Sequence, residues 1–224
     1  KKRYNYKMNG ETLETVDHHA YLGVELNDNL KYDTHIDNIT GKASQTLGFL
    51  KRNLNKCPQS VNERAYQTLE RPKLEYSSPI WNPTQKQTNE LKQLEQIQRN
   101  AARFVANKPY NPYQPDSVTT IINDLKWQSL QQRRQSSDLI LLYRVVYGLV
   151  AVPAYYLPDR SIILSTRGHN SQNFIPPQCL RNAYQHSFFP RTITIWNSLP
   201  TSVVTAPSLD SFKSAVRPLP VYRA

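Results

Sequence analysis

The hydrophobic pattern changes its period at Asp33, and this change constrains the fold more than any other feature. Before Asp33, polar and apolar residues alternate, which is typical of short strands. After it, apolar residues recur every three or four positions and predict an amphipathic helix; they are Ile36, Ile39, Ala43, Leu47, Leu50 and Leu54. The same spacing predicts helices over about 60–72, 91–105, 117–125, 129–150, 188–199 and 208–216. We therefore expect a mainly α protein with a small N-terminal antiparallel β-sheet, an α+β arrangement.

Three strands are expected before this switch. Residues 3–8 and 11–16 alternate on either side of Asn9-Gly10, a pair that suits a type I′ hairpin turn. Residues 20–26 form a third, more apolar run that Gly23 interrupts. A glycine inside a strand often marks a bulge or the close approach of another backbone.

Composition divides the chain into four regions. Residues 1–30 contain the expected strands and residues 31–108 the first helical bundle. A segment of alternating proline and tyrosine, residues 109–116, is expected to act as a linker. Residues 117–224 are expected to form a C-terminal region of helices and irregular, proline-rich chain.

The chain is strongly basic throughout. It has 28 Lys and Arg against 17 Asp and Glu, a formal net charge of +11. One acid-free stretch, residues 38–62, carries Lys42, Lys51, Arg52 and Lys56; another, residues 160–209, carries Arg160, Arg167, Arg181 and Arg191. Such stretches favour binding of a polyanion, because neutralised phosphates release counterions. A basic but otherwise solvated surface is the alternative.

Several classes of protein are excluded by what the sequence lacks. No apolar run approaches the roughly 18 residues of a membrane span, and no secretory leader is recognised. Cys57 and Cys179 are too few for a disulfide scaffold, and we expect a reducing compartment. Phosphate-binding glycine loops, nucleophile motifs and metal-ligand clusters are absent. The run Asp17-His18-His19 is interpreted as turn residues rather than as a metal site, since neighbouring strand residues face opposite ways.

A series of short blocks resembles one known family. Tyr21-Leu22-Gly23-Val24 is followed in order by blocks that resemble the C-terminal part of the reverse transcriptase of non-LTR (LINE-type, jockey-like) retrotransposons. These blocks are His35-Ile36, 47–52, 71–76, 80–83, 96–99, 101–103, 125–127 with Leu130, Arg133 and Arg134, 167–169, 187–193 and 196–200. The similarity extends from about Tyr21 to Val216. Glu70 departs from it, because an apolar residue is common there, and Tyr32 replaces a common tryptophan.

The resemblance implies a role for particular residues. Tyr21, Leu22 and Gly23 match the primer grip, a hairpin of the palm that holds the 3′ end of the primer. The helices that follow resemble the thumb, where Lys42, Lys51, Arg52 and Lys56 would face phosphates of the template–primer duplex. A second contact surface, for template RNA, is expected from Arg133, Arg134, Arg167 and Arg191.

The resemblance also implies partners that lie outside this chain. The catalytic aspartates of the polymerase, and the Mg²⁺ that they bind, would belong to an upstream part, together with the fingers, palm and endonuclease. We therefore expect a fragment without catalytic residues, metal or cofactor of its own, inactive alone. Its expected partners are template RNA, an RNA–DNA hybrid and those upstream domains, with no membrane. Its expected location is the nucleus or a cytoplasmic ribonucleoprotein.

Two other hypotheses remain open from the sequence. The chain could be a stand-alone helical module that binds RNA or DNA without a polymerase, or a structural or protein-interaction domain whose charge is incidental. Steep salt dependence would separate the last from the others. Trp127 and Trp196 could stack on bases, but the helical spacing around them favours packing in the core.

Overall fold

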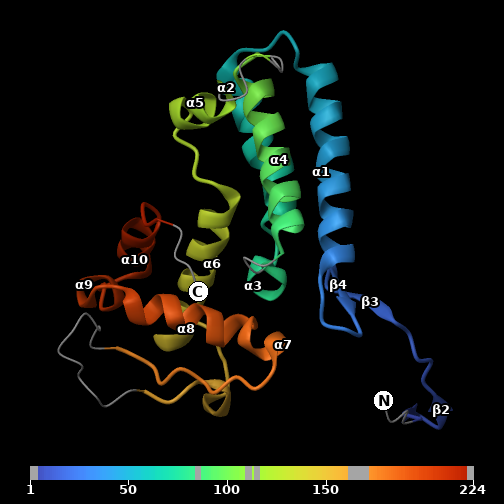
Figure 1. Ribbon diagram of the computed structural model, residues 1–224, viewed down its shortest axis with the longest axis vertical. Helices are drawn as coiled ribbons and strands as arrows, with labels where there is room; N and C mark the ends of the chain where they lie inside the picture. The colour runs from blue at the N-terminus through green and yellow to red at the C-terminus, as the bar shows by residue number, and fades with distance from the viewer. Residues whose placement is uncertain (1–4, 84–86, 109–112, 114–116, 161–171, 221–224) are drawn as a thin grey trace.

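The computed structural model describes residues 5–83, 87–108, 113, 117–160 and 172–220. The part of the chain that it describes is mainly helical, with two small hairpins at the N-terminal end (Figure 1). This confirms the fold class expected from the sequence. Within the described residues, no helix is long and apolar enough to cross a membrane.

The first hairpin pairs β1 (Lys7–Met8) with β2 (Glu11–Thr12) through Asn9 and Gly10, whose φ angles of 52° and 86° fit the expected type I′ turn. The second pairs β3 (His18–Tyr21) with β4 (Val24–Asn27). Between them Leu22 and Gly23 have φ angles of 46° and 81°. The expected third strand over 20–26 is therefore wrong. Since Gly23 takes a left-handed conformation next to Leu22, the chain reverses there, and two separate hairpins replace one three-stranded sheet.

Helix α1 (Asp33–Asn53) begins where the hydrophobic period changes, and its buried stripe includes Ile36, Ala43, Leu47 and Leu50. It lies beside α4 (Thr88–Val105), and the two helices run in the same direction (Figure 1). A hydrogen bond of 3.1 Å from Gln93 to Asp37 joins their second turns. These two helices form the axis of the bundle.

The segment between them is a helix of changing pitch. It begins as α2 (Gln59–Ala65), widens into the π-helical η1 (Tyr66–Glu70) and tightens into the 3₁₀-helical η2 (Arg71–Leu74). Pro72 sits in the first turn of η2, where its missing N–H costs little, so the expected end of the helix becomes a change of pitch. The wide turn buries both Tyr66 and Glu70 completely. The short α3 (Ser78–Trp81) follows.

Helix α5 (Ser117–Asp124) packs on α4, where Val118 and Ile121 contact Ala102. The helices on either side of residues 109–116 thus share one hydrophobic cluster. Helix α6 (Leu130–Val146) begins with a capping box of Ser129 and Gln132. It links the bundle to the C-terminal region, because Leu130 joins the cluster around α1 and α4 whereas its later residues face the opposite end.

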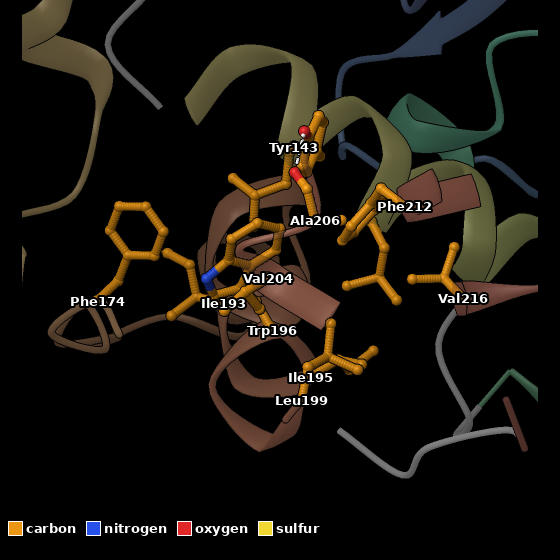
Figure 2. Packing of buried hydrophobic residues seen from close by; sticks show 12 residues of the cluster. Tyr143, Phe174, Ile193, Ile195, Trp196, Leu199, Val204, Ala206, Phe212 and Val216 are labelled. Carbon is orange, nitrogen blue, oxygen red and sulfur yellow. Dashed lines mark hydrogen bonds between the residues drawn. The ribbon is translucent and has the colours of Figure 1, made fainter. Parts of the chain in front are cut away.

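The C-terminal region has its own aromatic core, shown in Figure 2. Trp196 packs there against Phe212 and Phe174 and donates a hydrogen bond of 3.0 Å to the Gln172 carbonyl. The hydroxyl of Tyr143 on α6 donates to the Ala206 carbonyl at 2.8 Å. The elements of this region are the 3₁₀ turn η3 (Ala154–Tyr156), α7 (Asn182–Gln185), α8 (Phe188–Ser198), α9 (Thr201–Val204) and α10 (Leu209–Val216).

Candidate nucleic-acid interface

The three residues that resemble a primer grip lie together at the tip of the β3–β4 hairpin. Tyr21 ends β3, and Leu22 and Gly23 form the turn. The side chains of Tyr21 and Leu22 are 61 % and 73 % exposed. The tip therefore presents apolar side chains to the outside, within reach of a partner.

Tyr76, which follows η2, fixes the position of this tip. Its hydroxyl donates a hydrogen bond of 3.0 Å to the Leu22 carbonyl. A Cβ placed at Gly23 would lie 3.4 Å from Cε1 of the same ring. The close approach that glycine was expected to permit is thus made by an aromatic side chain of the same molecule.

The four cations expected on the thumb are all exposed. Lys42, Lys51 and Arg52 project from α1, and Lys56 follows its last turn; we call these four residues the α1 cations. None of them forms an ion pair with a described residue, in contrast to Arg133 and Arg191. Lys51 and Arg52 also lie in the last turn of α1, where the helix dipole favours positive charge. Their charge is available to an external anion.

The α1 cations do not all share one side of the helix. At 3.6 residues per turn, Lys42 and Lys51 lie about 180° apart around the axis, whereas Arg52 lies about 80° from Lys42. Phe49, 56 % exposed, falls between Lys42 and Arg52 on that side. An exposed aromatic ring flanked by cations is typical of surfaces that bind nucleic acid, although single exposed rings are also common.

Lys73 extends this surface and was missed by sequence reasoning. Its ammonium group donates a hydrogen bond of 2.5 Å to the hydroxyl of Thr46, one turn after Lys42 on α1. Lys73 lies in η2, 27 positions away in the sequence. The signal in the sequence that pointed to Lys73 was its place in Arg71-Pro72-Lys73, within the block 71–76. Its position beside α1 is set by the fold.

The hairpin tip and the last turn of α1 lie at opposite ends of that helix (Figure 1). With a rise of about 1.5 Å per residue, its 21 residues span roughly 30 Å. The two sets of expected contacts are thus separate, and a ligand that touches both must be an extended one.

The expected second surface needs correction, because two of its arginines lie inside the protein. Arg134 is fully buried, and Arg191 lies between α8 and α6 with 11 % of its side chain exposed. The Nε of Arg191 donates to Oδ2 of Asp138 at 3.1 Å. The Nε of Arg134 donates at 3.0 Å to the side-chain oxygen of Asn82. Guanidinium groups so placed connect helices and do not present charge to an RNA.

Asp138 is the centre of this network, which joins α3, α6 and α8. Its carboxylate also accepts a hydrogen bond of 3.1 Å from Asn82. Burial raises the pKa of Asp138, and the charge and hydrogen bond of Arg191 oppose that effect. Burial lowers the pKa of Arg134 to about 10, with Glu95 and then Asp138 acting in the opposite direction. The Nη atoms of Arg134 have no hydrogen-bond partner among the described residues.

Of the other two expected contacts, Arg133 is half-buried and Arg167 lies outside the described residues. Arg133 forms a two-pronged ion pair with Glu75, using its Nε and its Nη2. The hydrogen bonds that Arg133 donates to Glu75 raise the pKa of Arg133. This side chain remains partly accessible, so it is the member of the second set whose position suits contact with an external group.

The tryptophans fit the expected core packing, whereas the interpretation of Asp17-His18-His19 as turn residues is wrong, because His18 and His19 begin strand β3 and pair with β4. Trp196 is buried in the C-terminal core. Trp127 stacks on Tyr66 with ring centres 4.6 Å apart and donates a hydrogen bond of 2.8 Å to Glu63. Among the residues that the structure describes, no group of three or more His, Cys, Asp or Glu side chains could hold a metal ion.

Glu70 is an unusual buried acid beside the α1 cations. Both of its carboxyl oxygens are buried without a hydrogen-bond partner in the described part of the chain. Burial raises its pKa to about 8, while Lys51 and Lys73 oppose the shift. The Glu70 carboxyl group is therefore mostly uncharged at neutral pH, so it does not neutralise the positive charges of Lys51 and Lys73.

The comparisons with known proteins found no relative: no family model, no curated protein and no solved structure matches this chain.

Proposed function

We propose that the chain binds a nucleic-acid duplex, with an RNA–DNA hybrid as the preferred ligand, as the template–primer-binding part of an RNA-directed DNA polymerase. The observation that carries the proposal is the exposed α1 cations, which have no carboxylate partner among the described residues. An A-like duplex is held through its backbone and shape, which requires cations but no base-reading geometry. The sequence blocks that resemble non-LTR reverse transcriptases add the preference for a hybrid.

The hairpin tip has a defined part in this proposal. The exposed Tyr21 and Leu22 contact one end of the duplex, while the α1 cations that share one side of the helix, Lys42 and Arg52, contact phosphates further along. Tyr76 holds the tip in place through the Leu22 carbonyl. Lys73 adds a fifth cation beside Lys42. Catalysis is assigned to no residue of this chain.

The test is a comparison of affinities for an RNA–DNA hybrid, a DNA duplex and single-stranded RNA, measured by fluorescence anisotropy. In the test variant the α1 cations are replaced by glutamine. In the control variant four exposed cations elsewhere, Lys7, Arg144, Arg181 and Arg217, are replaced in the same way, so that both variants have the same net charge.

We expect the wild type and the control variant to prefer the hybrid, and the test variant to bind it at least tenfold more weakly. Equal loss in both variants would show that only net charge matters. Equal affinity of the wild type for all three ligands would favour the alternative function, a general RNA- or DNA-binding module. No binding of any of them would contradict both.

A further inference from the structure

A small polar cavity, which none of the α1 cations lines, lies between α2, η1, η2, α4 and the segment that leads from α5 into α6. Its volume is about 180 Å³, room for a small polar group. The residues that matter for its chemistry are Arg71, Lys126, Arg133, Glu63, Tyr66 and Gln98.

The cavity wall carries more positive than negative charge. Three cations line the cavity: Arg71, Lys126 and Arg133. Glu63 is the one acid among the residues that line it. The Oε1 of Glu63 already accepts hydrogen bonds from Trp127, at 2.8 Å, and from Gln67, at 3.0 Å. The Nε and Nη2 of Arg133 donate hydrogen bonds to Glu75, so Nη1 is the nitrogen of this side chain that remains for a ligand in the cavity.

Arg71 is the group that this arrangement leaves unexplained. Its guanidinium is half-buried and has no hydrogen-bond or ion-pair partner among the described residues. It also lies close enough to Arg133 for the two charges to repel each other. Burial lowers the pKa of Arg71, and the charge of Arg133 lowers it further, while Glu75 acts in the opposite direction. Glu75 pairs with Arg133, so the cation that lacks a direct partner here is Arg71, and a half-buried unpaired charge is costly unless an anion joins it.

The inner wall also leaves polar atoms unused. The Tyr66 hydroxyl and Oε1 of Gln98 are buried without a partner in the described part of the chain. Burial raises the pKa of Tyr66, so that its hydroxyl stays protonated and remains a donor. Unpaired buried polar groups beside a cavity indicate that water or a ligand completes the site.

We infer that this cavity binds a phosphate group, held by Arg71 and the remaining Nη1 of Arg133, with Lys126 at the rim. Planar guanidinium groups suit the oxygens of a phosphate, and an anion between Arg71 and Arg133 removes their repulsion. The phosphate could be inorganic or part of a nucleic-acid strand, since both present the same chemistry. None of the α1 cations lines this site, so phosphate binding here does not depend on the proposed duplex-binding surface.

The test uses inorganic phosphate as the probe and measures the midpoint of thermal unfolding and the binding isotherm, against chloride at equal ionic strength. We expect phosphate to stabilise the wild type, and Arg71→Gln to weaken phosphate binding at least tenfold. Lys126→Gln is a second variant at an exposed position, for use if Arg71→Gln does not fold. Arg64→Gln is the matched control, because Arg64 is an exposed arginine of α2 that does not line the cavity.

Loss of the phosphate effect in Arg71→Gln or Lys126→Gln, with Arg64→Gln unchanged, supports the site. A wild type that responds equally to phosphate and chloride, or variants that all respond alike, overturns it and leaves a cavity filled by water. A 5′-phosphorylated oligonucleotide, compared with its 5′-hydroxyl form, distinguishes the source of the phosphate. The variant without the α1 cations should still bind inorganic phosphate, which separates this site from the proposed function.

Discussion

At the scale of single residues, Glu70 is the clearest source of pH dependence. Its pKa is raised by burial to about 8 in the folded protein from 4.5 as a free side chain. The folded state therefore holds a proton that the unfolded chain has lost between these pH values. Stability should fall as pH rises through that window, with a slope of up to about 1.4 kcal/mol per pH unit.

We expect Glu70→Gln to flatten this decrease and to stabilise the protein at pH 7 to 8. Urea unfolding at several pH values between 5 and 8 measures the effect. Glu14→Gln, at an exposed position before β3, serves as the control and should leave the slope unchanged. A slope that survives in Glu70→Gln would show that another group is responsible.

Two aspartates allow a matched test of buried and exposed ion pairs. Asp138→Asn removes the charge that balances Arg191 inside the protein, and such losses typically cost about 3–5 kcal/mol. Asp210→Asn removes the partner of Lys213 in an exposed pair, which should cost less than about 1 kcal/mol. Urea unfolding of both variants measures the difference. Equal losses would mean that the network around Asp138 contributes no more than a surface pair.

At the scale of elements, two glycines should respond to alanine with opposite sign. Gly23 has a φ of +81° in the β3–β4 turn, so Gly23→Ala should destabilise the hairpin by about 1 kcal/mol. Gly41 lies inside α1 with open space around it, so Gly41→Ala should stabilise the helix by roughly 0.5–1 kcal/mol.

Hydrogen exchange locates these two effects. Amides of β3 and β4 should exchange faster in Gly23→Ala, while those of α1 should exchange more slowly in Gly41→Ala. Tyr76→Phe, which removes the hydrogen bond to Leu22, should resemble Gly23→Ala at the hairpin. Uniform changes across the chain would argue against a hairpin that is held at its tip.

The helices were predictable because their signals are local. Apolar spacing located α1, α4, α6 and α8, and the serines at the first positions of two predicted helices, Ser129 and Ser208, cap α6 and α10. The β3–β4 turn was missed because its first residue is Leu22, and leucine rarely adopts a positive φ. The π-helical turn at Tyr66–Glu70 was missed too, since it follows an ordinary helical pattern and depends on packing.

The candidate site was predictable in part, for the same reason. Exposed cations on one predicted helix, such as Arg52, could be read from the sequence. Arg134 and Arg191 could not be told from surface arginines, because their partners Asn82 and Asp138 lie more than 50 positions away. Pairing over such separations is set by how α3, α6 and α8 pack, which no local pattern records.

At the scale of the whole molecule, positive charge is divided between two uses. Arg134 and Arg191 bind helices to one another through Asn82 and Asp138, whereas the α1 cations remain exposed without partners among the described residues. Fewer positive charges are therefore available to a ligand than the net charge of +11 suggests. The central claim is that the α1 cations, and not net charge alone, bind a nucleic-acid duplex.

The most direct test of this claim is the salt dependence of hybrid binding. Each phosphate contact contributes roughly 0.9 to the slope of log K against log salt concentration on duplex DNA, and we take a similar value for a hybrid. The slope should be steep for the wild type and for the control variant lacking Lys7, Arg144, Arg181 and Arg217. It should be flatter by roughly two to four in the variant without the α1 cations. Equal slopes for both variants would contradict the account.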